Sequence, residues 1–343
     1  MIIKVKDHYR IDFFNELTFT LRYNSVASSY SFKMYFDPKN ENHVELLKPG
    51  HYHVMSIEHN GELLMTGSIL NQTFSHKSIK QLSSVSGYSL PGVLEDCTIP
   101  PNLYPLQSDG QTLREIAQKL IGFFPFGMKI DPLVASRMNE VYIKTTASES
   151  ESIKSYLSSL AAQKNIILSH TPEGDLLFTQ AKTDQKPFFH FEGGMSNIEM
   201  DLSFNGQGMH RDITVMKQAD KDGGNAGQTT TRNPFVPFTR RPNVKIQNSG
   251  NDIDTVKAAQ NALGTELKNI VLTIKTNFWE INGKTLIPNT TLTARSDELF
   301  MFGKVKWFVE SVTFSGNEKQ NTAVMKCVLP EVYNGNIPKY FFE

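Results

Sequence analysis

The histidines are the residues of this chain whose spacing comes closest to a metal site. His51 and His53 share one face of an expected strand, and His43 and His59 lie nearby in the sequence. Two imidazoles at positions i and i+2 can hold zinc when a third ligand converges on them. No cysteine or carboxylate pair adjoins them with ligand-like spacing, so the pattern favours exposed or interface histidines. We therefore expect no metal site and no cofactor.

The glycine-rich segment at 220–227 has the composition of a calcium or phosphate loop without its pattern. A calcium loop needs an oxygen ligand at its fifth position, glycine at its sixth and a bidentate glutamate at its twelfth. Here these positions hold Gly224, Asn225 and Thr231. A phosphate-binding loop continues through Gly-Lys-Ser/Thr into a helix, whereas prolines follow in this chain. Both comparisons favour a flexible loop.

Catalytic motifs do not appear in the sequence either. It contains no Gly-x-Ser-x-Gly elbow and no His-Glu-x-x-His. Glu149 and Glu151 stand at an expected helix start, where carboxylates interact favourably with the helix dipole without any catalytic role. A triad assembled from distant residues leaves no local motif. The pattern favours a protein that is not an enzyme.

Composition narrows the class of protein further. The 343 residues are enough for two or three domains. With 35 basic and 35 acidic side chains and no long run of either sign, nucleic acid is not the expected main partner. No stretch of 18 apolar residues predicts membrane insertion, and the N-terminus lacks the apolar region of a signal peptide. Cys97 and Cys327 lie among apolar residues, so we expect reduced core thiols in a protein made in the cytosol.

The elements that must position these residues begin with strands. Apolar and polar residues alternate over Leu17–Tyr23 and over Tyr30–Phe36, which predicts two strands with one buried face each. Asn60-Gly61 lies between Val54–His59 and Glu62–Thr66 and suits a type I′ turn, because both central residues need positive φ. Short strands with regular turns indicate a small barrel or sandwich.

A joint rich in glycine and proline follows this first segment. Gly87, Pro91 and Gly92 are expected to break regular structure, and Pro100-Pro101 delays the next helix. One domain is therefore expected to close near residue 97 and a different one to open near residue 108.

The second segment changes to a helical period. Two helices are expected, each with one apolar stripe at i, i+3, i+4, i+7 and i+8 or a close variant. Ser108 or Asp109 is the expected cap of the first helix, and Ser148 with Glu151 has capping-box spacing before the second. A strand at 166–168 and another at 176–178 complete an α+β part. The stripes are Leu113, Ile116, Ala117, Leu120 and Ile121, then Ile153, Tyr156, Leu157, Leu160 and Ala161.

The third segment returns to strands. Asn282-Gly283 predicts a second tight hairpin, Val305, Trp307 and Val309 alternate, and Thr322–Leu329 reads as a final apolar strand. One helix interrupts the strands at about Asp252–Leu267, with Asp252 as its expected cap.

These patterns predict a mainly β protein with an α+β insertion, in which two small β-barrel domains flank an α/β segment. The expected boundaries are residues 1–97 for the first barrel, 98–187 for the α+β domain and 188–343 for the second barrel.

Contacts with other proteins are expected at a long loop and at the C-terminus. The polar connection 217–241, roughly 25 residues, is long for an internal loop, and we expect a partner to order it. Guanidinium groups suit bidentate pairing with carboxylates, and aromatic clusters seldom stay exposed on a monomer. Solvated loop charges and ordinary packing are the alternatives. The candidate interface residues are Arg232, Arg240, Arg241, Phe235, Phe238, Phe341 and Phe342.

Several short motifs, in order along most of the chain, resemble the baseplate hub proteins of contractile phage tails. This is the protein D and phage Mu tail-hub family, which is related to the phage T4 baseplate hub. The family has a Gly-Arg-Ser-x-x-x-Asp-Leu-Val-Asp-Cys-type segment at the joint, and Tyr88 replaces its usual Arg here. The matching positions are Gly87, Leu94, Asp96 and Cys97, then Met65-Thr66-Gly67, Arg241–Val244 and Phe308–Phe314.

The resemblance implies a structural role in a virion. Family members are expected to have two β-barrels beside an α/β part and to close into a ring of three copies. Such a homotrimer would hold the central spike protein on one face and the tail tube on the other, among other baseplate proteins. It would be assembled in the host bacterial cytoplasm, and the loop at 217–241 looks like an addition to the pattern.

Two other functions remain as alternatives at this stage. One is a tail-tip receptor- or glycan-binding module, which predicts clustered exposed aromatic side chains. The chain has two tryptophans, and the alternation around Trp307 predicts its burial. The other is a tail-associated cell-wall hydrolase, for which we expect no room because the sequence ends at Glu343, soon after the second β segment.

Overall fold

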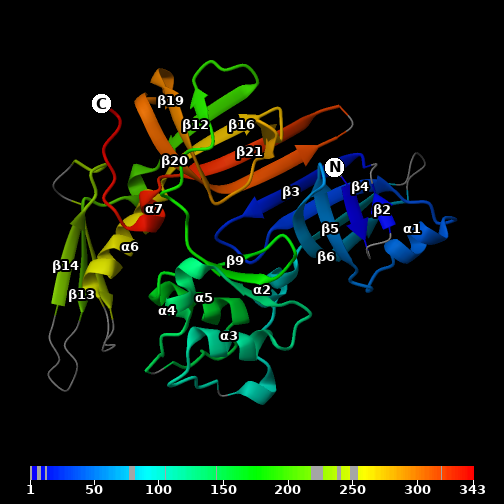
Figure 1. Cartoon of the computed structure of the whole chain (residues 1–343), viewed down its shortest axis with the longest axis horizontal. Coiled ribbons are helices and arrows are strands. Elements are labelled where there is room, and N and C mark those ends of the chain that lie inside the picture. The colour runs from blue at the N-terminus through cyan, green and yellow to red at the C-terminus, as the bar shows by residue number, and fades with distance from the viewer. Residues whose placement is uncertain are drawn as a thin grey trace. The chain divides into compact units, whose positions relative to one another are not determined.

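The computed structural model describes most of the chain, which forms two compact units (Figure 1). Both are built mainly from strands, which confirms the predicted mainly β fold class. The three-part division at residues 97 and 187 stays a prediction. The described residues are 2–5, 9–11, 14–76, 82–104, 106–143, 145–217, 227–237, 241–247, 254–317 and 319–343. Unit 1 is Met1–Gln180, Phe278–Pro288 and Ser311–Ala323, and unit 2 is Ala181–Asn277, Asn289–Glu310 and Val324–Glu343.

A sheet of mostly antiparallel neighbours dominates unit 1. Its strand order is β20, β3, β4, β7, β6, β5, β1, β2, where β20 contributes only its C-terminal part. The short helix α1, Glu41–Leu46, lies between β4 and β5 in the sequence. The strands are β1 Ile2–Val5, β2 Tyr9–Ile11, β3 Glu16–Arg22, β4 Ser29–Tyr35, β5 Val54–His59, β6 Glu62–Phe74, β7 Leu82–Ser89 and β20 Met301–Gly316.

Period-two burial holds this sheet together. The residues Leu17, Phe19 and Leu21 of β3 are buried, as the alternation predicts, while their neighbours in the strand face outward. Phe19 stacks on Phe314 of β20 with ring centroids 4.6 Å apart, and Trp279 meets both rings edge-on. Aromatic pairs of this kind add to the stabilisation that burial alone provides.

Both Asn-Gly turns are confirmed, and the two hairpins contact each other. Asn60 and Gly61 have φ of 49° and 83°, and Asn282 and Gly283 have φ of 53° and 71°. The second hairpin joins two very short strands, β17 Glu280–Ile281 and β18 Lys284–Thr285. The His59 imidazole lies 2.7 Å from the Glu280 carboxylate, and Thr285 donates to Glu62 at 2.8 Å.

The joint near residue 90 differs from the expectation at Gly87. This glycine does not interrupt β7, which continues to Ser89. A Cβ at position 87 would lie 2.0 Å from the main-chain oxygen of Ser68, so glycine lets β6 and β7 approach closely. Pro91 and Gly92 do end the strand, in a turn of 3₁₀ helix over Leu90–Gly92. Tyr88, which stands where the resembling family has Arg, donates its hydroxyl to Asp96 at 2.5 Å.

The helical part of unit 1 has the two predicted stripes, and all ten of their residues are buried. Its apolar core also takes in Val26 and Leu94 from the preceding segment. A three-stranded sheet with the order β8, β10, β9 accompanies the helices. The elements are α2 Val93–Asp96, a 3₁₀ turn at Pro101–Leu103, α3 Leu113–Ile121, β8 Met128–Ile130, a 3₁₀ turn at Pro132–Val134, α4 Ala135–Met138, α5 Ile153–Gln163, β9 Ile167–His170 and β10 Leu176–Thr179.

The caps of these helices were predicted at the wrong residues. Thr112 caps α3, in a reciprocal capping box with Glu115, whereas Ser108 is held by a main-chain bond to Thr145. Asp109 likewise accepts from the Thr145 amide, so tertiary bonds use this segment before the helix begins. Ser152, rather than Ser148, caps α5.

The strands of unit 2 continue from β20, which both units share, in the order β20, β21, β16, β12 on one side and β20, β19, β11 on the other. A separate three-stranded sheet, β14–β13–β15, packs against helix α6 (Figure 1). The elements are β11 His190–Glu192, β12 Ile198–Phe204, a 3₁₀ turn at Gly206–Gly208, β13 Asp212–Lys217, β14 Gly227–Arg232, β15 Pro242–Gln247, α6 Thr255–Leu267, β16 Ile270–Thr276, β19 Thr290–Ser296, a 3₁₀ turn at Asp297–Leu299, β21 Asn321–Val328 and α7 Glu331–Asn334.

Two expectations for this region need correction. The connection 217–241 is not a loop throughout, because β14 lies inside it and pairs with β13 from Gly227 to Arg232. Its β-branched run Thr229–Thr231 favours a strand. Helix α6 begins at Thr255 with Asp254 as its cap. The expected cap, Asp252, lies outside the described residues.

Within the described residues, no helix has the length and apolar character needed to cross a bilayer. Cys97 and Cys327 are both free thiols. Burial raises the pKa of the Cys327 thiol through desolvation, and the negative charge of Glu310 raises it further. A thiol with a raised pKa is mostly protonated and a poor nucleophile.

Candidate functional site

The open face of the three-stranded sheet in unit 2 is the strongest candidate for a contact surface. The strands run in register, so that Thr214 of β13 lies between Thr230 of β14 and Val244 of β15. A hydrogen bond of 2.8 Å joins the hydroxyls of Thr214 and Thr230. We call this surface the open face. It comprises Asp212, Thr214, Met216, Gln228, Thr230, Arg232, Pro242, Val244 and Ile246.

The other side of the same sheet faces helix α6. Ile213 and Val215 are fully buried there. Thr229 bonds to Thr255 at the start of α6, at 2.8 Å. Asn243 donates to the buried carboxylate of Glu266 at 3.0 Å. The helix therefore fixes which residues point outward, because strand side chains alternate between the two sides.

Three apolar side chains are largely exposed on the open face. The exposed fractions are 55% for Val244, 59% for Ile246 and 39% for Met216. The register places Met216 directly beside Ile246. These side chains lie on β15, an edge strand, and on the adjoining end of β13. Exposed apolar side chains beside polar and charged ones are common in protein interfaces.

The arginines predicted as contacts have different environments. Arg232 is exposed on the open face, and no ion pair involves it within the described part of the chain. Arg241 instead donates to the main-chain oxygens of Gly206 and Gln207, at 3.0 and 2.9 Å. Its guanidinium therefore ties two segments of the same chain together. Arg240 and Phe238 lie outside the described residues.

The predicted aromatic contacts pack on one another within unit 2. Phe235 is buried, with 3% of its surface exposed, and its ring lies 5.4 Å from Phe341 and 5.8 Å from Phe342. Phe341 also meets Trp307 edge-on at 5.9 Å. Phe341 and Phe342 remain partly exposed, whereas Phe235 offers little surface to another chain in this structure.

Sequence reasoning missed the apolar residues of the open face. The alternation of Val244, Lys245 and Ile246 has the period of a strand, and it would have indicated a half-buried element. Which of its two sides is covered could not be read from this alternation, because α6 supplies the cover.

The described residues contain one close serine–histidine pair. The His170 Nε2 lies 2.6 Å from the Ser28 hydroxyl, and burial lowers the pKa of the imidazole. Ser28 is completely buried and also accepts from the amide of Arg22. A substrate has no access to this hydroxyl, so the pair stabilises the packing of β9 against the β3–β4 turn.

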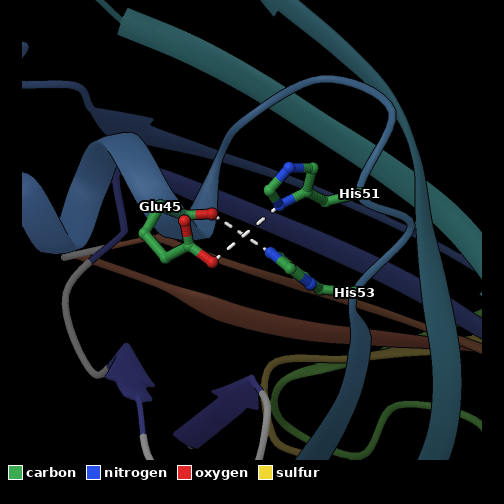
Figure 2. A group of neighbouring side chains, drawn as sticks. All are labelled: Glu45, His51 and His53. Carbon is green, nitrogen blue, oxygen red and sulfur yellow. Dashed lines mark hydrogen bonds and ion pairs between the residues drawn. The ribbon is translucent and has the colours of Figure 1, made fainter.

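The metal expectation changes, because a carboxylate joins two of the histidines singled out above. Glu45 lies against His51 and His53, as Figure 2 shows. His43 and His59 have other partners, the amide of Asp37 and the carboxylate of Glu280. Sequence spacing concealed this group, since Glu45 belongs to helix α1 and the histidines follow it.

A glycan-binding tip would need exposed aromatic side chains, and the two tryptophans do not provide them. Both tryptophans are buried, Trp307 completely and Trp279 with 5% exposed, so neither offers a stacking platform. An open pocket of about 430 Å³ lies between β2, β4 and α1 in unit 1 and includes Tyr9, Tyr35 and Asn42 among its lining residues.

Comparisons with known proteins give one consistent result at the level of fold. No protein-family model matches the chain, and a search of curated proteins found no match. Among solved structures, the 43 kDa tail protein of prophage MuSo2 from Shewanella oneidensis has a TM-score of 0.79 at 19% identity, covering 97% of this chain and 99% of that one. A tail protein from Neisseria meningitidis has 0.78 at 17% identity, covering 97% of each chain.

A type VI secretion system component from E. coli, described as structurally similar to the bacteriophage T4 tail proteins gp27 and gp5, has a lower TM-score. The value is 0.59 at 8% identity, covering 99% of this chain and 80% of that one. The chain therefore shares its fold with phage tail proteins over nearly its whole length.

Proposed function

We propose that this protein is a structural baseplate hub of a phage or phage-like contractile tail. Three copies would form a ring that joins the central spike to the tail tube. Its partners would be copies of itself, the spike protein, the tube and other baseplate proteins. The protein would reside in the virion after assembly in the host bacterial cytoplasm. This role is mechanical and requires neither covalent chemistry nor a cofactor.

One observation carries the proposal, namely the likeness in fold over almost the whole of both chains to two phage tail proteins. A shared domain alone would be weak support, because common folds serve many functions. Here the likeness covers 97% of this chain in both comparisons. The motifs around Gly87–Cys97 support the same class of protein independently of the fold.

A ring of three copies is consistent with the two β parts of the chain. Each chain would contribute its two β segments, so a ring of three chains would present six similar segments. Such a ring could bind a spike of threefold symmetry on one face and a tube of sixfold symmetry on the other. A head-to-tail contact that closes after three rotations gives a finite ring rather than a fibre. We assign the open face to this contact, because its exposed apolar side chains, Met216, Val244 and Ile246, would be buried against the next copy while Arg232 on β14 finds a carboxylate.

The first test is the native mass of the purified chain by light scattering, followed by averaging of negatively stained particles. We expect three times the 38.7 kDa of one chain and ring-shaped particles. If the chain alone is monomeric, spike protein is added and the mass of the complex is measured. A chain that remains monomeric under both conditions would refute the trimeric hub.

A second test addresses the open face. Replacing Val244 and Ile246 together by lysine places two charges in the proposed contact and should shift the mass towards one chain. The matched control is Ile143→Lys, which changes a side chain that is 70% exposed in unit 1 and should leave the trimer intact. Unchanged circular dichroism would show that both variants are folded. A V244K/I246K protein that still trimerises would exclude this face as the contact.

A further inference from the structure

Glu45, His51 and His53 form a compact group of metal-binding side chains at one end of helix α1. Glu45 lies in the last turn of α1, and both histidines lie in the short connection to β5. The connection turns back through left-handed conformations at Gly50, with φ of 82°, and at Tyr52, with φ of 49°. This turn brings both imidazoles beside the glutamate (Figure 2).

The distances within the group are close to those of a metal site. The His51 Nδ1 lies 3.9 Å from a carboxylate oxygen of Glu45. The two imidazole rings meet edge to face, with centroids 5.1 Å apart. One ligand atom from each of the three residues lies within 4.8 Å of the other two. A tetrahedral zinc ion with bonds of about 2.0–2.2 Å holds neighbouring ligand atoms ~3.4 Å apart.

Burial differs between the ligands in a way that suits metal entry. His53 is only 8% exposed, so the surrounding residues hold its ring. Its Nε2 lies 3.1 Å from the main-chain oxygen of Glu45, a contact that a metal ion at Nε2 would replace. The side chains of His51 and Glu45 are 34% and 45% exposed. Because both side chains reach the surface, an inward rotation of about 1 Å could bring their ligand atoms to zinc distances and leave a fourth position to water.

We propose that Glu45, His51 and His53 bind a divalent transition-metal ion of the zinc class. Two imidazoles and one carboxylate form a ligand set that zinc accepts, whereas calcium and magnesium require oxygen ligands. Binding through the Nε2 of His53 would release its hydrogen bond to the Glu45 carbonyl, with the imidazole proton on Nδ1. The ion would fasten the end of α1 to the start of β5. This site does not depend on the proposed hub function.

The experiment is calorimetric titration of zinc chloride into the full chain, purified without a histidine tag. We expect one zinc ion per chain in the wild type. Each of Glu45→Gln, His51→Gln and His53→Gln should weaken binding at least about tenfold, since loss of even an indirect partner of a zinc ligand costs 10–100-fold. Magnesium chloride should give no binding heat.

The exposed His51 is the decisive position, because its replacement should leave the fold intact. The matched control is His76→Gln, an exposed histidine outside the group, which should bind zinc as the wild type does. Zinc should also raise the Tm of the wild type and of H76Q but not that of H51Q, because a ligand stabilises only a state that binds it. No zinc binding by the wild type, or equal affinity in H51Q, would overturn the proposal.

Discussion

A buried carboxylate shows how single residues are held in unit 2. Glu310 of β20 is 5% exposed, yet it has three partners of suitable chemistry. The Tyr333 hydroxyl donates to it at 2.6 Å, the Lys326 ammonium lies 3.0 Å away and that of Lys268 lies 4.0 Å away. A buried carboxylate is tolerated when such partners satisfy its oxygens.

These partners predict how stability depends on pH. Burial raises the pKa of Glu310, but the bonds from Tyr333 and Lys326 and the two lysine charges outweigh it, so the pKa lies below its ordinary value of 4.5. The stabilisation is therefore complete above about pH 4.5 and is lost as the pH falls through the folded-state pKa. We expect Glu310→Gln to lower the free energy of unfolding by about 1–3 kcal/mol at pH 7. The measurement is urea unfolding of both proteins.

The wild type and E310Q should differ less in their free energy of unfolding when both are measured at successively lower pH below 4.5. Other carboxylates also titrate there, but they are common to both proteins and cancel in the difference. If the difference in free energy of unfolding stayed constant down to pH 3, the charge of Glu310 would not be what stabilises this site.

At the scale of elements, the close approach of two strands can require glycine at a position where strand propensity disfavours it. Gly87 lies inside β7, where a side chain would collide with the Ser68 oxygen of β6 and with the Tyr30 hydroxyl, 2.8 Å away. The same Tyr30 hydroxyl donates to the Ser68 oxygen. Glycine in a strand interior often marks such an approach.

Gly87→Ala should therefore destabilise the protein by about 2–3 kcal/mol, because the added methyl group forces strands β6 and β7 apart. Chemical unfolding followed by circular dichroism measures this. Gly303→Ala is the matched control, since position 303 is also in a strand but has no atom within 4 Å of the added Cβ. Equal stability of the two variants would contradict the close-approach explanation.

At the scale of the whole molecule, each unit is assembled from separate stretches of the chain. Residues 278–288 and 311–323 belong to unit 1 although they follow most of unit 2 in the sequence. The C-terminal part of β20 pairs with β3 and places Phe314 on Phe19. Thr20 and Thr313, which share a hydrogen bond of 2.9 Å, are 293 positions apart.

A fragment of residues 1–180 should consequently fail to fold as unit 1 does. Without residues 311–316, strand β3 has an unpaired edge. Phe19 also loses its ring contacts with Phe314 and, because residues 278–288 are absent too, with Trp279, which exposes apolar surface. We expect aggregation or non-cooperative unfolding, measured by size-exclusion chromatography and thermal circular dichroism beside the full chain. A monomeric fragment with a sharp transition would disprove this dependence.

The candidate sites were only partly predictable. Arg232 is exposed, as its polar surroundings suggest, but Arg241 and Phe235 serve contacts within the chain. The apolar part of the open face was missed because one helix decides which side of the sheet is covered. The sequence did not predict the group of Glu45, His51 and His53. These residues meet because the chain turns at Tyr52, whose positive φ is unusual for a residue other than glycine.

The sequence by itself determined the local elements of this protein. The alternation in β3 and β4, the apolar stripes of α3 and α5 and both Asn-Gly turns follow from backbone geometry, which each short segment carries within itself. The tertiary structure alone decided which strands are neighbours, where the helices are capped and which side chains meet. Such pairings join residues far apart in the chain, and the period of one segment shows that a side of it is buried without showing which other segment covers it.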